Sequence, residues 1–193
     1  MRTVTMPGMH LVGIDPGLSL TGFACVRVCA EQPLSQPELV EAGVFRLDRR
    51  RSVSERLVEL ERDVCDLLGR VRPVCVCVES LFSHVAHPRT SVIMGHARGV
   101  ILLAVARSGI ELIELPPAEV KKAVTGNGRA SKPQVQQAVV TQLGLASVPE
   151  PPDVADAIAA ALCGSRRWAA SVLSAGTPGR APAEALHSAS FPR

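Results

Sequence analysis

Residues 73–79 read Pro-Val-Cys-Val-Cys-Val-Glu, and they give the clearest indication of the fold class. Five apolar residues follow the proline without a break, so neither face of a strand built from them would meet water. Such a run is typical of an interior strand in a parallel sheet. It ends on a carboxylate, Glu79, which we therefore place at the carboxyl end of a buried strand.

Apolar periodicity on either side of this stretch predicts further strands and helices. Residues 10–15 and 21–28 are separated by the turn signal Pro16-Gly17, which predicts a hairpin. The remaining predicted elements are, in chain order, a strand at 39–47, helices at 52–69 and 91–108, a strand at 110–115, and helices at 118–123, 132–143 and 153–168. The fold class is therefore α/β, a mixed five-stranded sheet flanked by helices.

The length of 193 residues favours one folded domain, which we place at residues 9–168. Residues 169–193 are dominated by Ala, Ser, Pro and Gly, which predicts a disordered tail. No apolar run is long enough to cross a membrane, and the start lacks a secretory signal. The six cysteines contain no C-x-x-C pair. We therefore expect reduced cysteines in a cytoplasmic protein.

Four acidic residues stand at the ends of predicted elements. Asp15 and Glu79 each end an apolar strand, whereas Asp153 and Asp156 lie three apart at the start of a helix and share one face. Carboxylates brought together repel each other, and a divalent cation such as Mg²⁺ or Mn²⁺ removes that cost. Two such ions, about 4 Å apart, activate a water and stabilise the leaving oxygen at a phosphodiester.

Each of these acids also has an ordinary structural explanation. Asp15 precedes Pro-Gly and suits a turn, and Glu79 could begin a solvated loop. Asp153 and Asp156 suit the cap and first turn of a helix. These explanations share no common cause, whereas one metal site accounts for all four positions.

The basic residues are less evenly spread than the net charge of +3 suggests. All three lysines, Lys121, Lys122 and Lys132, lie within one twelve-residue window, which indicates a local basic site. His84 and His87 have the H-x-x-H spacing of metal ligands. We reject that interpretation, because the pair lies in a predicted loop with no third ligand motif beside it.

Five segments together resemble the motifs of RuvC-type Holliday junction resolvases, in the order found in that family. They are GIDPG at 13–17, VESLF at 78–82, GHARGV at 95–100, VKKAVTGNGRASK at 120–132 and DVADA at 153–157. The similarity extends from about residue 10 to residue 168. The first motif alone is shared with other RNase H-like proteins, whereas the lysine segment followed by D-x-A-D-A is specific.

The resemblance implies an RNase H-like nuclease domain that works as a homodimer. Such a protein resolves four-way DNA junctions by symmetric nicking during recombination and repair. The apolar helix at 91–108 would contribute to the dimer interface through Ile93 and Val100. The resemblance also implies a branch-migration helicase complex of the RuvA–RuvB type as a partner.

The same resemblance assigns roles to individual residues. Asp15, Glu79, Asp153 and Asp156 become catalytic ligands of two Mg²⁺ ions per subunit, for which Mn²⁺ substitutes. It also implies five DNA contacts. Phe82 would stack on bases, and Lys121 and Lys132 would lie near the scissile phosphate. The other two contacts are Asn127 and Arg129 in the basic segment.

Three other functions stay open at this point. Another RNase H-like nuclease, such as one that processes ribosomal RNA, is disfavoured by the lysine segment and the D-V-A-D-A motif. A junction-binding protein without catalysis is disfavoured because all four acids are present, and an ATP-binding actin-like protein by the small size of the chain. Residues 83–90 depart from the commoner family pattern, so the resemblance does not fix the cleavage-sequence preference.

Overall fold

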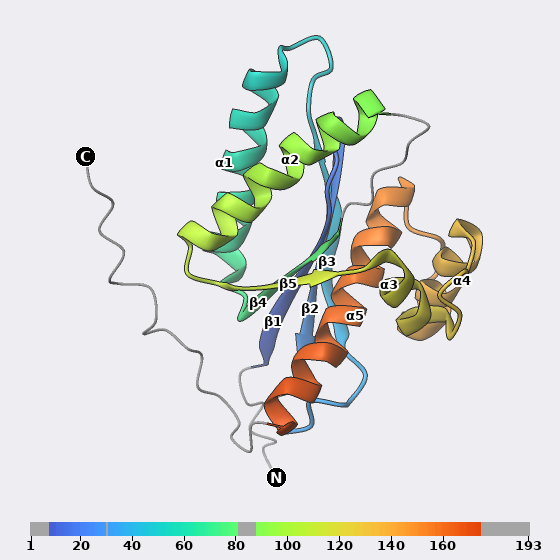
Figure 1. The fold of residues 1–193 in the computed structure, drawn as a ribbon. Coiled ribbons are helices and arrows are strands. Elements are labelled where there is room, and N and C mark those ends of the chain that lie inside the picture. The colour runs from blue at the N-terminus through green and yellow to red at the C-terminus, as the bar shows by residue number, and fades with distance from the viewer. Residues whose placement is uncertain (1–7, 30, 81–87, 175–193) are drawn as a thin grey trace.

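A computed structural model describes residues 8–29, 31–80 and 88–174. One five-stranded sheet in the order β3-β2-β1-β4-β5 forms the centre of this part of the chain (Figure 1). Its strands are β1 (Met9–Asp15), β2 (Leu20–Val28), β3 (Glu38–Arg46), β4 (Cys75–Glu79) and β5 (Glu111–Leu115). The helices are α1 (Val53–Val71), α2 (Pro88–Arg107), α3 (Pro117–Thr125), α4 (Lys132–Leu143) and α5 (Pro152–Ser174).

Strand β1 lies in the middle of the sheet and pairs in both senses. It runs antiparallel to β2, which confirms the predicted hairpin, and parallel to β4, with Ile14 opposite Val78. Strand β5 is parallel to β4. Because β1 and β4 point the same way, Asp15 and Glu79 stand side by side at the carboxyl edge of the sheet, where α/β proteins usually place their ligands.

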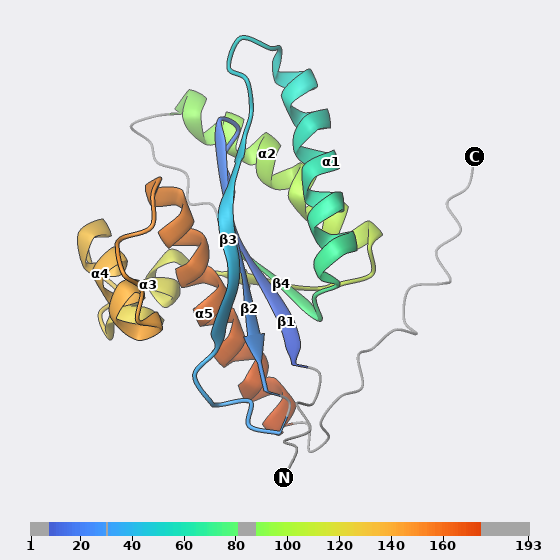
Figure 2. The same ribbon diagram turned by 180° about the vertical axis from the view of Figure 1, so that it is seen from behind.

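Helices cover both faces of the sheet and create two cores. Helices α1 and α2 lie on one face, and α5 lies on the other with α3 and α4 beside it (Figures 1 and 2). Strand β4 serves both cores, because Cys75 and Cys77 point to the α5 side while Val76 and Val78 point to the α1–α2 side. All four side chains are fully buried, which confirms the prediction from residues 73–79. The six cysteines are free.

The start of α5 lies directly on the backbone of β1 and β2. A Cβ atom at Gly13 would overlap the main chain of Ala157 and Ala161, and one at Gly22 would overlap the carbonyl of Asp153. Only glycine allows so close an approach. These two glycines therefore bring the first turns of α5, with its two aspartates, against the strand that ends in Asp15.

The sequence-based prediction is wrong about where the last helix ends. The composition of residues 169–174 predicts a disordered tail, yet α5 continues through Ser174, and both Trp168 and Ala169 are buried. Residues 175–193 lie outside the described part of the chain. Among the described residues, no helix combines the length and apolar character needed to cross a membrane.

Candidate active site

The four predicted acids converge at the carboxyl edge of the sheet. Asp15 and Glu79 end the neighbouring parallel strands β1 and β4, and Asp153 and Asp156 lie in the first turns of α5. Burial is the largest cause that raises the pKa of Asp15 from its ordinary value of 3.8 to about 8. The charges of Asp156, Glu79 and Asp153 contribute to the same rise in that order, and the charge of Lys132 opposes it. The structure thus brings all four carboxylates within electrostatic reach of one another.

Two lysines face this acidic cluster, as the sequence predicted. Lys132 Nζ donates a hydrogen bond to Asp156 Oδ2 over 3.0 Å, and both Lys132 and Lys121 lower the pKa of Glu79. Burial and the charge of Asp156 act in the opposite direction and leave the pKa of Glu79 above its ordinary value. Lys132 is held protonated, because its hydrogen bond to Asp156 raises its pKa.

Local capping signals in the sequence set the end of the helix that carries Lys121 and the start of the helix that carries Lys132. Helix α4 begins at Lys132 because Ser131 and Gln134 form a capping box, in which the Ser131 amide donates to Gln134 Oε1 over 2.8 Å. Helix α3, which carries Lys121, ends at Gly126, whose φ of 78° suits glycine. Lys122 is exposed, in agreement with its interpretation as a surface residue.

The predicted DNA contacts Asn127 and Arg129 lie in the turn between α3 and α4. Asn127 Oδ1 accepts a hydrogen bond from the Arg129 amide over 2.9 Å, so this side chain shapes the turn. Both residues are exposed, and their contact with DNA stays a prediction. Phe82, His84 and His87 lie outside the described residues.

The chemistry of this donor set fits a hard divalent cation. The four carboxylates supply only oxygen ligands. A bound cation would offset the cost of burying the Asp15 charge beside other carboxylates, which is the cost that raises the pKa of Asp15. Within the described ranges, however, no three carboxylate, imidazole or thiol groups already stand close enough together to hold a metal ion. One oxygen of Asp156 is instead engaged by the Lys132 ammonium.

Arg98 lies in the GHARGV motif, but the sequence alone assigns it no role. Its guanidinium Nε donates to the main-chain carbonyl of Glu79 over 3.3 Å, and its Nη2 pairs with the Glu114 carboxylate. The GHARGV motif marked the right helix. Nothing in the sequence indicates which residues would bind an arginine in that helix.

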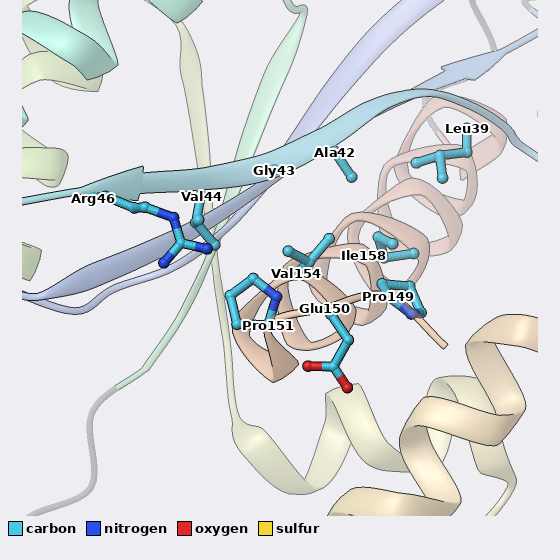
Figure 3. A pocket seen from close by; sticks show the side chains of 10 residues that line it. All are labelled: Leu39, Ala42, Gly43, Val44, Arg46, Pro149, Glu150, Pro151, Val154 and Ile158. Atoms are coloured by element: carbon cyan, nitrogen blue, oxygen red, sulfur yellow. The ribbon is translucent and has the colours of Figure 1, made fainter. Parts of the chain in front are cut away.

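A separate groove lies behind the start of α5. Figure 3 shows it between β3 and the loop that leads into α5, with Arg46 and Glu150 as its charged residues. Its volume is about 370 Å³, and none of the four acids lines it. The carboxylate cluster is thus not enclosed in this groove.

Comparison with known proteins identifies the family. A sequence model described as "Crossover junction endodeoxyribonuclease RuvC" matches residues 11–164. A protein of that name from Rhodopirellula baltica is 46% identical over 159 residues, covering 80% of this chain and 84% of the relative. Another from Synechococcus sp. strain RCC307 is 40% identical over 154 residues, covering 80% of this chain and 96% of the relative.

Solved structures give the same answer. The RuvC structure of Thermus thermophilus in complex with a Holliday junction substrate is 30% identical, with a TM-score of 0.76, and the match covers 84% of this chain and 96% of that one. The yeast mitochondrial Holliday junction resolvase Ydc2 shares the fold at 15% identity, with a TM-score of 0.60, and that match covers 87% of this chain and 82% of that one. These neighbours confirm the RNase H-like fold. The chain belongs to the RuvC family of crossover junction endodeoxyribonucleases.

Proposed function

We propose that this protein is a metal-dependent endonuclease that nicks four-way DNA junctions in symmetric pairs. The observation that carries the proposal is the meeting of Asp15, Glu79, Asp153 and Asp156 with Lys132 at one sheet edge, in a member of this family. A relative with the same fold was solved with a Holliday junction substrate. That substrate supports the choice of DNA over the ribosomal RNA alternative.

The acidic residues and the lysines of the site would have different roles. The four acids would hold two Mg²⁺ ions per subunit, with Mn²⁺ as a substitute, and the ions would supply an activated water and Lewis-acid stabilisation at the phosphodiester. Lys132 remains protonated beside the cluster, so it offers a fixed positive charge to a phosphate that gains negative charge during the reaction. Lys121, on the Glu79 side, supplies a second one.

A homodimer fits both the task and the surface of α2. A four-way junction is roughly two-fold symmetric and needs two cuts, which a two-fold dimer delivers. Three apolar side chains of α2 are exposed, Val92, Ile93 at 37% and Leu103 at 54%. We propose that a second copy covers them. Val100, which the sequence analysis also named, is half-buried against the α1–α2 core and contributes less.

We also propose a cytoplasmic setting and a branch-migration helicase complex of the RuvA–RuvB type as partner. Both proposals rest on the family to which the chain belongs.

The test is cleavage of an end-labelled synthetic four-way junction by the purified protein in Mg²⁺ or Mn²⁺. Linear duplex DNA and single-stranded RNA are run alongside, and Asp156→Asn is the inactive control. Paired symmetric nicks in the junction alone, lost in the variant, would establish the function. Binding without cleavage in either metal would indicate a junction-binding protein, and cleavage of RNA alone would overturn the assigned substrate.

A further inference from the structure

Arg98 ties helix α2 to the end of the strand that carries Glu79. Its Nε donates to the Glu79 carbonyl over 3.3 Å, while its Nη2 pairs with Glu114 on the adjacent edge strand β5. On the other side of the same peptide unit, the Ser80 amide donates to the Leu115 carbonyl over 2.8 Å. The main chain that leaves Glu79 is therefore held from α2 and from β5 together.

Arg98 itself is mostly buried, although its carboxylate partner is half exposed. Its side chain is 16% exposed, compared with 52% for Glu114. A guanidinium with so little solvent contact must find its hydrogen-bond partners in the protein. The planar fork of arginine reaches both partners at once, which the single ammonium of lysine does not.

Glu79 needs such support because its strand ends there. Strand β4 stops at Glu79, whose strand partner on β5 is Leu115. The register of β4 on β1 extends only to Ile14 and Val78, one position before Glu79. The carboxylate is therefore placed by the main-chain bonds of Glu79 and Ser80 to α2 and β5.

We propose that Arg98 is a positioning residue, which fixes the Glu79 main chain so that its carboxylate meets Asp15 and Asp156 in the geometry required for catalysis. The inference rests on the proposed nuclease function for its kinetic consequence, but not for its structural one. In this role Arg98 acts through the Glu79 main chain. Misplacement of a catalytic group by about 1 Å lowers rates on the order of 100-fold.

The experiment compares Arg98→Ala and Arg98→Lys with Arg107→Ala. Arg107 is a matched control, because it ends the same helix and its ion pair with Glu61 is long, at 3.8 Å, and exposed. Amide hydrogen exchange is measured on the DNA-free, metal-free protein. Single-turnover nicking of the junction and junction affinity in Ca²⁺ are measured separately, and thermal unfolding monitors folding.

If Arg98 positions Glu79, Arg98→Ala raises exchange at the Ser80 amide by at least about tenfold, while the β1–β2 amides keep their protection. Nicking slows on the order of 10- to 100-fold with an affinity within about twofold of the parent, because phosphate contacts are intact. Arg98→Lys gives exchange and nicking rates between those of the parent and Arg98→Ala, since lysine restores one contact. Arg107→Ala matches the parent in every measurement.

Unchanged protection of Ser80 in Arg98→Ala would overturn the proposal. So would equal loss of protection across all strands, which indicates general destabilisation, or a rate loss matched by an equal loss of affinity. If the parent protein itself nicks no junction, the proposed function fails. The exchange experiment then decides on Arg98 alone, because it requires neither DNA nor metal.

Discussion

Replacing Asp15 with asparagine is expected to stabilise the metal-free protein at alkaline pH. Burial and three nearby carboxylates raise the pKa of Asp15 to about 8 in the folded state, against an ordinary value of 3.8. A raised pKa in an acid means that folding disfavours the ionised form. The folded protein therefore loses stability as pH rises from about 4 to about 8, and the full penalty remains above pH 8.

The size of the effect follows from the same shift. A change of about four pKa units corresponds to roughly 6 kcal/mol at about 1.4 kcal/mol per unit, which is an upper bound. Side-chain relaxation and the partial solvent contact of Asp15 reduce it. From pH 5 to pH 9 we therefore expect the free energy of unfolding of Asp15→Asn to increase by about 2–4 kcal/mol relative to that of the parent. Asparagine has nearly the same shape, so packing against α5 is retained.

The assay is urea unfolding in EDTA at pH 5, 7 and 9, with parent, Asp15→Asn and Asp66→Asn. Asp66 is an exposed aspartate of α1, far along the helix from its capped start, and its variant removes one charge without touching the cluster. The free energy of unfolding of Asp15→Asn should rise relative to both others only as pH increases. Adding Mg²⁺ should narrow the gap by stabilising the parent. Parallel pH profiles for all three proteins would refute the electrostatic argument.

Three further predictions concern packing, catalysis and assembly. Gly13→Ala should lower the free energy of unfolding by about 3 kcal/mol or more, because its Cβ overlaps the α5 backbone, and a loss below 1 kcal/mol in urea would contradict this packing. Lys132→Ala should slow single-turnover nicking on the order of 100-fold with little loss of junction binding, whereas Lys122→Ala should retain the parent rate; equal rates for the two variants would exclude this role. Leu103→Glu should sediment as a monomer while Val58→Glu, on the exposed face of α1, stays dimeric; an unchanged dimer in Leu103→Glu would argue against the α2 interface.

The parts of the fold that could be predicted depend on short-range patterns. The apolar run at 73–79 is readable because burial on both faces leaves no polar position, and the Pro16-Gly17 turn fixes the hairpin. Strand ends then place Asp15 and Glu79 at one edge, and helical spacing puts Asp153 and Asp156 on one face. These local rules predict each pair of acids, whereas the meeting of the two pairs follows from the metal-site hypothesis and the family resemblance.

Two features depended on tertiary contacts that no local rule contains. Residues 169–174 look like the tail that follows them, yet the burial of Ala169 against the sheet extends α5 beyond Trp168. The partners of Arg98 are set by how α2 crosses the sheet, and that crossing depends on the whole α1–α2 core. Sequence patterns predict which face is buried, but not which atoms meet across it.

The docking of α5 on Gly13 and Gly22 has a consequence for the cell as well as for the fold. Two of the four acids arrive only with this last described helix, so a ribosome must synthesise nearly all of the nuclease domain before the acids can meet. A nascent or truncated chain that lacks α5 carries Asp15 and Glu79 without their counterparts. The four-carboxylate cluster is therefore complete only when the domain has been synthesised almost to its end.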